Sequence, residues 1–383
     1  MSKRTRRQFL EVAGTTVAAV AVAPAALASG RQIPPIDTVV PGLPDLPLPE
    51  LPVGPTAPYS GYQSEIYIAG MSAGVKPPFT TNLAGLEAAA DEVLPGAARR
   101  QLLESAGGAA AVRANDAALQ AWRVVPRMFL DRAERVHETT VLGATMPAPV
   151  ILGPVGRQAS AHPAAEVASA RAAAGLGLTY VHAPDASLPL EAPALAAVPG
   201  PRWLALDWPA APDRALLARA RVAGCTHLVL TPPPRGTGWG ALAEIRKAWN
   251  GPVVLSGVQR VADARAAVRR GFDGIVVSNE RGRRGPAAAG TIDDLPAIAD
   301  AVGGKAAVLF GSGVRTGTDV YRALALGAEA VVLGRPYVHG LALGGEAGVR
   351  HVLRTLLAEL DITLAVAGVA DHRKLGPDAL VRA

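Results

Sequence analysis

The sequence predicts an α/β fold, a (β/α)8 TIM barrel with an N-terminal helical and hairpin extension. From about residue 148 onward, short apolar runs alternate with Ala-rich amphipathic stretches, as in parallel strands joined by helices. Eight such units close a barrel of the usual size. The alternative is an open doubly wound sheet, but no G-x-G-x-x-G follows the first apolar run.

The predicted elements are short and evenly spaced. The strands are expected at Val150–Gly153, Thr179–Val181, Trp203–Leu206, His227–Leu230, Val253–Leu255, Gly274–Val277, Ala306–Phe310 and Ala330–Leu333. The helices between them are expected at Glu166–Ala174, Arg214–Ala223, Trp239–Trp249, Val261–Arg270, Leu295–Val302 and Val320–Leu326. The extension should form helices near Leu83–Val93, Ala97–Ser105 and Asn115–Arg123, then a hairpin near Thr139–Pro149 that plugs the barrel bottom.

The first 28 residues have the pattern of a twin-arginine signal peptide. Arg6 and Arg7 precede Phe9-Leu10, an apolar run follows, and small residues end it at Ala28. An ordinary signal or an uncleaved anchor is the alternative, but the run is too short and too interrupted for stable membrane insertion. We expect export to the periplasm, the cell surface or the medium. Residues 29–58 are Pro-rich and predict a linker, which leaves 59–383 for the barrel domain.

The charge and cysteine content exclude several classes of protein. The formal net charge is +6, and four basic residues against Glu11 place half of it in the leader. No Lys/Arg tract with interleaved aromatics is present, which argues against a nucleic-acid partner. Cys225 is the only cysteine, so an intrachain disulfide is impossible, and we expect it to be a small core residue. No H-E-x-x-H or similar spacing predicts a metal site.

Glycine and arginine cluster after the last two predicted strands. The seventh is followed by Gly311-Ser312-Gly313-Val314-Arg315, and the eighth by Gly334-Arg335. Glycines let main-chain amides approach an anion, and guanidinium groups add charged hydrogen bonds. TIM barrels commonly bind phosphate after strands 7 and 8. The pattern therefore predicts a phosphate site, although turn glycines with surface arginines would look the same.

These residues belong to stretches that resemble a known family, the FMN-dependent 2-hydroxy-acid oxidases and dehydrogenases. The similar stretches run in the family's order from about Tyr59 to the C-terminus. They include "WRVVPRMFLD", "HPAAEVASARAAA", "DGIVVSN", "GTDVYRALALGAEAVVLGRPYVHGLALGGEAGVRHVL" and "ELDITLAVAG". The stretch "YQSEIYIAGMSAGVKPPF" is most similar to the lactate 2-monooxygenase branch.

The resemblance implies an FMN cofactor and a small 2-hydroxy acid as substrate, and it leaves a homo-oligomer open. It implies that the cofactor is bound by Pro154, Val155, Gly156, Thr231, Ser278, Gly311, Ser312, Gly313, Arg315, Gly334 and Arg335. Arg283 matches the arginine that binds the substrate carboxylate, and Glu280 stands where the family has its catalytic histidine.

Several other family positions are substituted. Ser256 replaces a lysine near flavin N1, and Ala205 and Asp207 replace a glutamine and a tyrosine after strand 3. Ala183 replaces a serine, and Gly311 replaces a ribityl-binding aspartate. Three more family features are missing, namely the aspartate expected after Thr231, the long loop with a second substrate arginine, and an early tyrosine.

These losses predict altered activity. Histidine suits a base near neutral pH, whereas a carboxylate at Glu280 would also repel a substrate carboxylate. One alternative is a catalytically degenerate barrel that binds a ligand or serves a structural role. Another is an enzyme of different chemistry that binds a phosphorylated ligand. His182, Asp207 and Glu280, with Asp185 nearby, could also form a new metal or acid/base set at the barrel mouth.

Overall fold

The computed structural model describes residues 58–102, 110–128, 134–192, 200–208, 213–231, 239, 241–280 and 290–383. The predicted signal peptide, all but the last residue of the predicted linker, and Arg283 lie outside these ranges. Among the described residues, no helix is long and apolar enough to cross a membrane.

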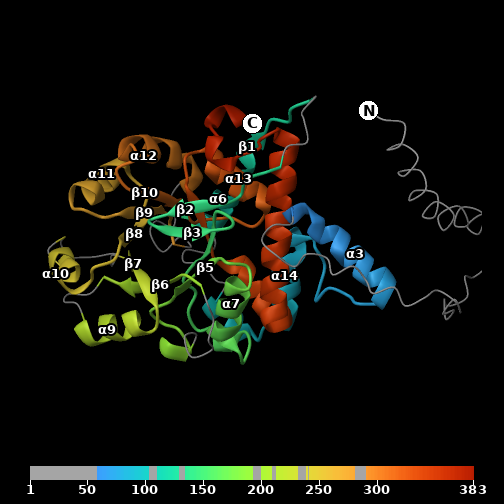
Figure 1. Ribbon diagram of the computed structural model, residues 1–383, viewed down its shortest axis with the longest axis horizontal. Helices are drawn as coiled ribbons and strands as arrows, with labels where there is room; N and C mark the ends of the chain where they lie inside the picture. Colours follow the sequence, from blue (N-terminus) through green and yellow to red (C-terminus); the bar gives the residue numbers. More distant parts are fainter. Residues whose placement is uncertain are drawn as a thin grey trace, which may run out of the picture. The chain divides into compact units, whose positions relative to one another are not determined.

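Eight parallel strands form a closed barrel, which confirms the predicted TIM fold (Figure 1). Their order around the barrel is β10-β11-β4-β5-β6-β7-β8-β9, so the first strand pairs with the last. The bounds are β4 (Val150–Leu152), β5 (Thr179–His182), β6 (Arg202–Asp207), β7 (Cys225–Thr231), β8 (Val253–Val258), β9 (Gly274–Val277), β10 (Ala307–Phe310) and β11 (Ala330–Leu333).

The helices that follow the strands include six near predicted positions and a long final one that was not predicted. They are α7 (Ala165–Ala174), α9 (Arg214–Val222), α10 (Ala241–Ala248), α11 (Val261–Arg269), α12 (Leu295–Val302), α13 (Gly317–Ala325) and α14 (Arg335–Ala367), with short 3-10 turns η3 (Gln158–Ser160) and η4 (Thr291–Asp293). Helix α13 begins three residues before its predicted start because Thr316 and Asp319 form a capping box at its N-terminus.

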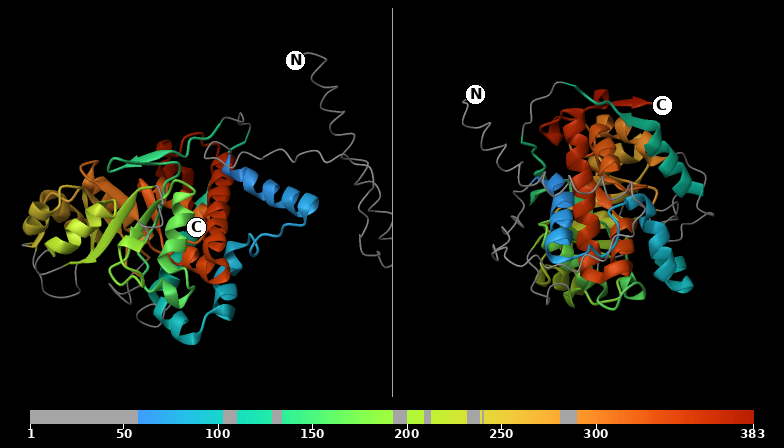
Figure 2. Two further views of the ribbon diagram at one scale, coloured as in Figure 1. Left: turned by 60° about the horizontal axis from the view of Figure 1, so that its bottom comes forward. Right: turned by 90° about the vertical axis from the view of Figure 1, so that its right-hand side faces the viewer.

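The extension contains more structure than predicted (Figure 2). Its elements are η1 (Tyr59–Gly61), α3 (Tyr62–Ala73), η2 (Leu83–Gly85), α4 (Leu86–Val93), α5 (Gly96–Leu102), α6 (Ala110–Ala121), β1 (Trp122–Val124), β2 (Thr139–Val141) and β3 (Ala144–Met146). The helix predicted near Asn115–Arg123 is wrong at both ends. It ends at Ala121 because the next three residues form β1, which pairs with β12 (Leu380–Arg382). Strand β12 is preceded by the 3-10 turns η5 (His372–Lys374) and η6 (Pro377–Ala379).

The β2–β3 hairpin closes the bottom of the barrel, as predicted. Its Val141 and Met146 are fully buried among side chains of the barrel interior, including Trp203. The carbonyl of Leu142 lies 3.0 Å from Nε2 of His227. The opposite end of the barrel is therefore the accessible one.

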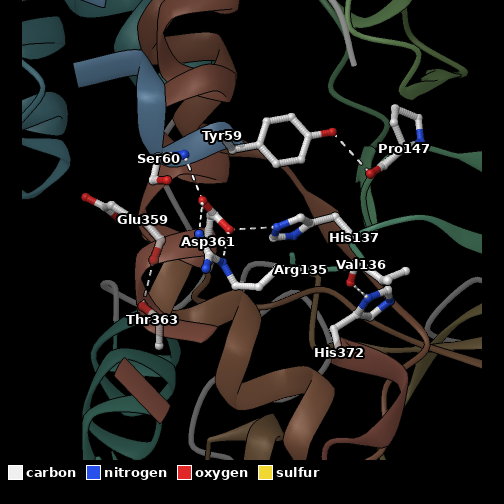
Figure 3. A network of polar contacts seen from close by, with 10 residues as sticks. All are labelled: Tyr59, Ser60, Arg135, Val136, His137, Pro147, Glu359, Asp361, Thr363 and His372. Atoms are coloured by element: carbon white, nitrogen blue, oxygen red, sulfur yellow. Dashed lines mark hydrogen bonds and ion pairs between the residues drawn. The ribbon is translucent and has the colours of Figure 1, made fainter. Parts of the chain in front are cut away.

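A buried carboxylate joins the extension to α14 (Figure 3). Asp361 is fully buried and accepts hydrogen bonds from both Nε and Nη2 of Arg135. Nε2 of His137 lies 2.9 Å from Oδ1 of Asp361, and the backbone N–H of Ser60 donates to Oδ2 at 2.9 Å. Burial raises the pKa of Asp361, but the hydrogen bonds from His137, Arg135 and Ser60 outweigh burial and hold the pKa far below its usual value.

Candidate functional site

A cavity at the C-terminal ends of the barrel strands contains most of the predicted site residues. Those that line it are Pro154, Val155, Thr231, Ser278, Glu280, Gly311, Ser312, Gly313, Arg315, Gly334 and Arg335. Gly156 does not line the cavity, and Arg283 lies outside the described residues. Active sites of TIM barrels occupy this end of the fold.

The loop between β10 and α13 forms one end of the cavity. Gly313 has a φ of 76°, and a side chain there would press on Leu119 and Asn115 at about 3 Å, so glycine is required. The backbone N–H groups of Arg315 and Thr316 donate to Oδ2 of Asp319 at 3.0 Å each. This capping interaction fixes the loop. The N-terminus of α13 follows the C-terminal end of β10 and therefore lies at the end of the barrel that holds the cavity.

Two arginines enter the cavity at this end. Arg315 donates from Nη1 to the carbonyl of Val314 at 3.2 Å, and its Nε lies 3.8 Å from a carboxylate oxygen of Glu87. Its Nη2 is buried and has no hydrogen-bond partner in the described structure. Arg335 is buried at the first turn of α14. An unsatisfied guanidinium N–H is costly to bury, so this end is well suited to an anion such as a phosphate.

A neighbouring wall is formed by the segment that follows β4, the strand that pairs with β11. Tyr337 donates a hydrogen bond from its hydroxyl to the carbonyl of Gly153 at 2.8 Å, and Gln158 donates from Nε2 to the carbonyl of Val155 at 2.8 Å. These contacts hold Pro154 and Val155 against the cavity. Gly156 has another role, because a Cβ there would lie 1.9 Å from Oδ1 of Asp185. It permits two loops to approach each other.

Two substituted family positions are in direct contact. The Ser256 hydroxyl donates to Oε1 of Glu280 at 3.0 Å, and both residues line the cavity. The backbone N–H of Glu280 donates to Oγ of Ser278 at 3.0 Å. Glu280 has a φ of 50°, a left-handed conformation that a non-glycine residue rarely adopts. This strained backbone is typical of functional positions.

Sequence reasoning missed Asn115, which lines the cavity from α6. The side-chain amides of Asn115 and Asn279 donate to each other, at 3.1 and 3.2 Å. Asn115 Oδ1 also accepts from the backbone N–H of Thr291 at 3.1 Å. The only signal in the sequence was a polar residue within an Ala-rich stretch. Part of the extension therefore reaches the barrel mouth, whereas the sequence predicts only the hairpin of the extension at the barrel, and at its bottom.

The structure does not form the alternative set of His182, Asp207 and Glu280. Asp207 and Glu280 line the cavity, but His182 points away from it into the layer between sheet and helices. No cluster of three potential metal ligands occurs in the described part of the chain. Cys225 is a buried core residue as predicted, and burial raises the pKa of its thiol to about 11.

Comparison with known proteins identifies the family. The sequence model of a protein family described as FMN-dependent dehydrogenase matches residues 90–232 and 234–382. The chain belongs to this family. It is 33% identical to an FMN-dependent alpha-hydroxy acid dehydrogenase, qulF, of Penicillium citrinum, over 86% of this chain and 97% of that protein. It is 32% identical to an L-lactate oxidase of Lysinibacillus sphaericus, over 80% of this chain and 94% of that protein.

Solved structures agree with this assignment. A crystal structure of mandelate oxidase with 3,3-difluoro-2-hydroxy-3-phenylpropionic acid matches with a TM-score of 0.72 and 36% identity, over 78% of this chain and all of that chain. FMN is the cofactor of the family. The residues present fit it, because Arg315 and Arg335 can bind its phosphate and the Pro154–Val155 wall can lie along its ring.

Proposed function

We propose that this protein is an exported FMN-dependent oxidoreductase that oxidises a 2-hydroxy acid, with Glu280 in place of the usual histidine base. The observation that carries the proposal is the cavity itself. It has a buried, unsatisfied guanidinium N–H at one end and the hydrogen-bonded Ser256–Glu280 pair among its remaining walls. Groups that can bind a cofactor phosphate and a carboxylate that can act as a base therefore line one cavity.

FMN, held by the residues named above, would supply the two-electron oxidant for the carbon that carries the hydroxyl. Glu280 would accept the hydroxyl proton on its carboxylate, so that the products are a 2-oxo acid, reduced flavin and a protonated Glu280. Ser256 orients that carboxylate through its hydrogen bond. Arg283 is the residue we propose for binding the substrate carboxylate. Ser256 carries no charge and so would not supply the cation that a lysine supplies beside the flavin, and we propose slower turnover than in relatives that retain the lysine.

The cofactor assignment is tested by Arg315→Ala. Removing one charged hydrogen-bond donor should weaken FMN binding about ten- to a hundred-fold, since such bonds contribute about 1.5–3 kcal/mol. The measurement is quenching of flavin fluorescence when FMN is titrated into the apoprotein. Arg269→Ala, on the exposed face of α11, is the matched control and should bind FMN like the wild type.

The same preparations separate the proposal from a degenerate barrel. An oxidoreductase should be purified yellow, and a 2-hydroxy acid should bleach it without oxygen. If the protein binds FMN but no 2-hydroxy acid reduces the bound flavin, the proposed catalytic activity is contradicted and the proposed cofactor binding is not. Equal FMN affinity in the Arg315→Ala variant and the wild type would contradict the proposed phosphate site.

A further inference from the structure

A second cavity, of about 450 Å³, lies on the outer face of the barrel beside the site already described. Its walls are Leu204 and Leu206 of β6, Leu216 and Leu217 of α9, and further apolar side chains from the segment after β5 and from α10, namely Leu188, Leu190 and Ile245. Successive side chains of a strand point to opposite faces of a sheet. Trp203, Ala205 and Asp207 of β6 accordingly line the central cavity inside the barrel. The volume lies within the range of small-molecule sites, about 300–1,000 Å³.

One buried polar group in this cavity lacks a partner. His182 is 6% exposed and lines the cavity, and its Nδ1 is buried without a hydrogen bond to any residue that the structure describes. Two other polar residues of the lining are already engaged. Asp213 caps α9 by accepting from the N–H of Leu216 at 3.0 Å, and Arg219 makes a two-fold ion pair with Glu191. An unpaired buried imidazole nitrogen is costly, so a ligand that supplies its hydrogen bond would be favoured.

The two cavities meet at the strand ends. Pro184, which follows β5, and Asp207, the last residue of β6, line both of them. Asp207 stands where the family resemblance implies a tyrosine, and Ala183, another lining residue, stands where it implies a serine. Both replacements are smaller than the expected side chains. The shared lining residues place the two cavities next to each other at the ends of β5 and β6.

We propose that this outer cavity binds the side chain of the substrate, and that the substrate is a 2-hydroxy acid with an extended apolar side chain ending in a hydroxyl or carbonyl group that hydrogen-bonds His182. The inference rests on the proposed function, because the hydroxy-acid end must lie in the central cavity. The leucine walls bury the apolar part of the side chain. Burial lowers the pKa of His182, so the neutral ring offers one donor and one acceptor.

Chain length is the first test. With the holoenzyme, kcat/KM for flavin reduction should rise about four-fold for each methylene between lactate and 2-hydroxyoctanoate, because each buried methylene contributes about 0.8 kcal/mol. Leu216→Trp, which fills the cavity from α9, should abolish that rise, measured as the ratio of kcat/KM for 2-hydroxyoctanoate to kcat/KM for lactate. An equal rise in this variant, or none in the wild type while lactate still reduces the flavin, would overturn the proposal.

His182 is tested by the end group. The wild type should prefer 2,8-dihydroxyoctanoate to 2-hydroxyoctanoate by about two- to ten-fold, the contribution of one neutral hydrogen bond. His182→Phe should lose this preference and His182→Gln should keep it, which separates a hydrogen bond from a packing role. The same preference in all three proteins would contradict the assigned contact.

A binding measurement separates this inference from the proposed function. Calorimetric titration with octanoate and acetate needs no turnover, and octanoate should bind more tightly to the wild type but not to Leu216→Trp. If the protein holds no FMN but still discriminates between the two acids in this way, the oxidoreductase assignment fails while the cavity assignment stands. If FMN is bound and neither protein discriminates, the cavity assignment fails alone.

Discussion

At the scale of single residues, the notable feature is a pair of replacements that interact. Ser256 contacts Glu280 although the two are 24 positions apart, because Ser256 lies in β8 and Glu280 follows the neighbouring strand β9. The sequence identified both as departures from the family. It could not show that they contact each other, since that depends on the register of strands and on the left-handed backbone at Glu280. Asn115 was missed for a similar reason, because its role depends on Asn279.

Glu280→Gln tests the proposed base. The amide keeps the size of the side chain but cannot accept the substrate proton, so the rate of anaerobic flavin reduction should fall by about 10²- to 10⁴-fold. FMN affinity should stay within about two-fold, because the phosphate end of the cavity is untouched. Stopped-flow absorbance measures the first quantity and fluorescence titration the second. Glu244→Gln, on the exposed surface of α10, serves as the control, and an unchanged rate in Glu280→Gln would rule out the proposed base.

At the scale of elements, the strands and the barrel helices follow from the sequence because their hydrophobic periods are strong and local. The extension was harder to predict. Three-residue strands such as β1 have almost no pattern of their own, and β1 exists only because β12 lies beside it. The attachment of the extension through Asp361 was not predicted either, because a single carboxylate in a helix shows nothing of the Arg135, His137 and Ser60 groups that surround it.

Asp361→Asn should destabilise the protein by about 3–5 kcal/mol, because it leaves the Arg135 charge without its buried partner. Urea denaturation at pH 7 measures the loss. Asp300→Asn, at an exposed position on α12, is the control and should change the free energy of unfolding by less than about 0.5 kcal/mol. A similar small effect at both positions would show that the network contributes little.

The same carboxylate predicts an acid dependence. The folded-state pKa of Asp361 lies below its unfolded value of about 3.9, so its contribution to stability is complete above that value and is lost as the pH falls below it. The wild type should therefore lose more free energy of unfolding between pH 5 and pH 3 than Asp361→Asn does. Parallel slopes for the two proteins over this interval would contradict the assignment.

At the scale of the whole molecule, the fold class and the cofactor could both be derived from the sequence. The barrel follows from the repeated units, and the cofactor follows from the family stretches around the last two strands. The route of export is a proposal that rests on Arg6 and Arg7 and the apolar run after them. Since the twin-arginine route carries folded proteins, we propose that FMN binds before transport.

Replacing Arg6 and Arg7 together with lysine tests that route. The variant should remain in the cytoplasm as a folded flavoprotein, because the charge of the leader is kept while the paired arginines are lost. Cell fractionation followed by immunoblotting measures the distribution, and Lys3→Arg is the control that should be exported normally. Undiminished export of the double-lysine variant would exclude the twin-arginine route.

The pairing of β1 with β12 has a consequence for the order of assembly. The two strands are separated by about 260 residues, so this small sheet cannot form on the ribosome until residue 382 has been synthesised. Every barrel strand is made earlier and can pair first. The two-stranded sheet would then be the last contact to form, and truncated translation products would present an unpaired β1 edge to proteases and chaperones.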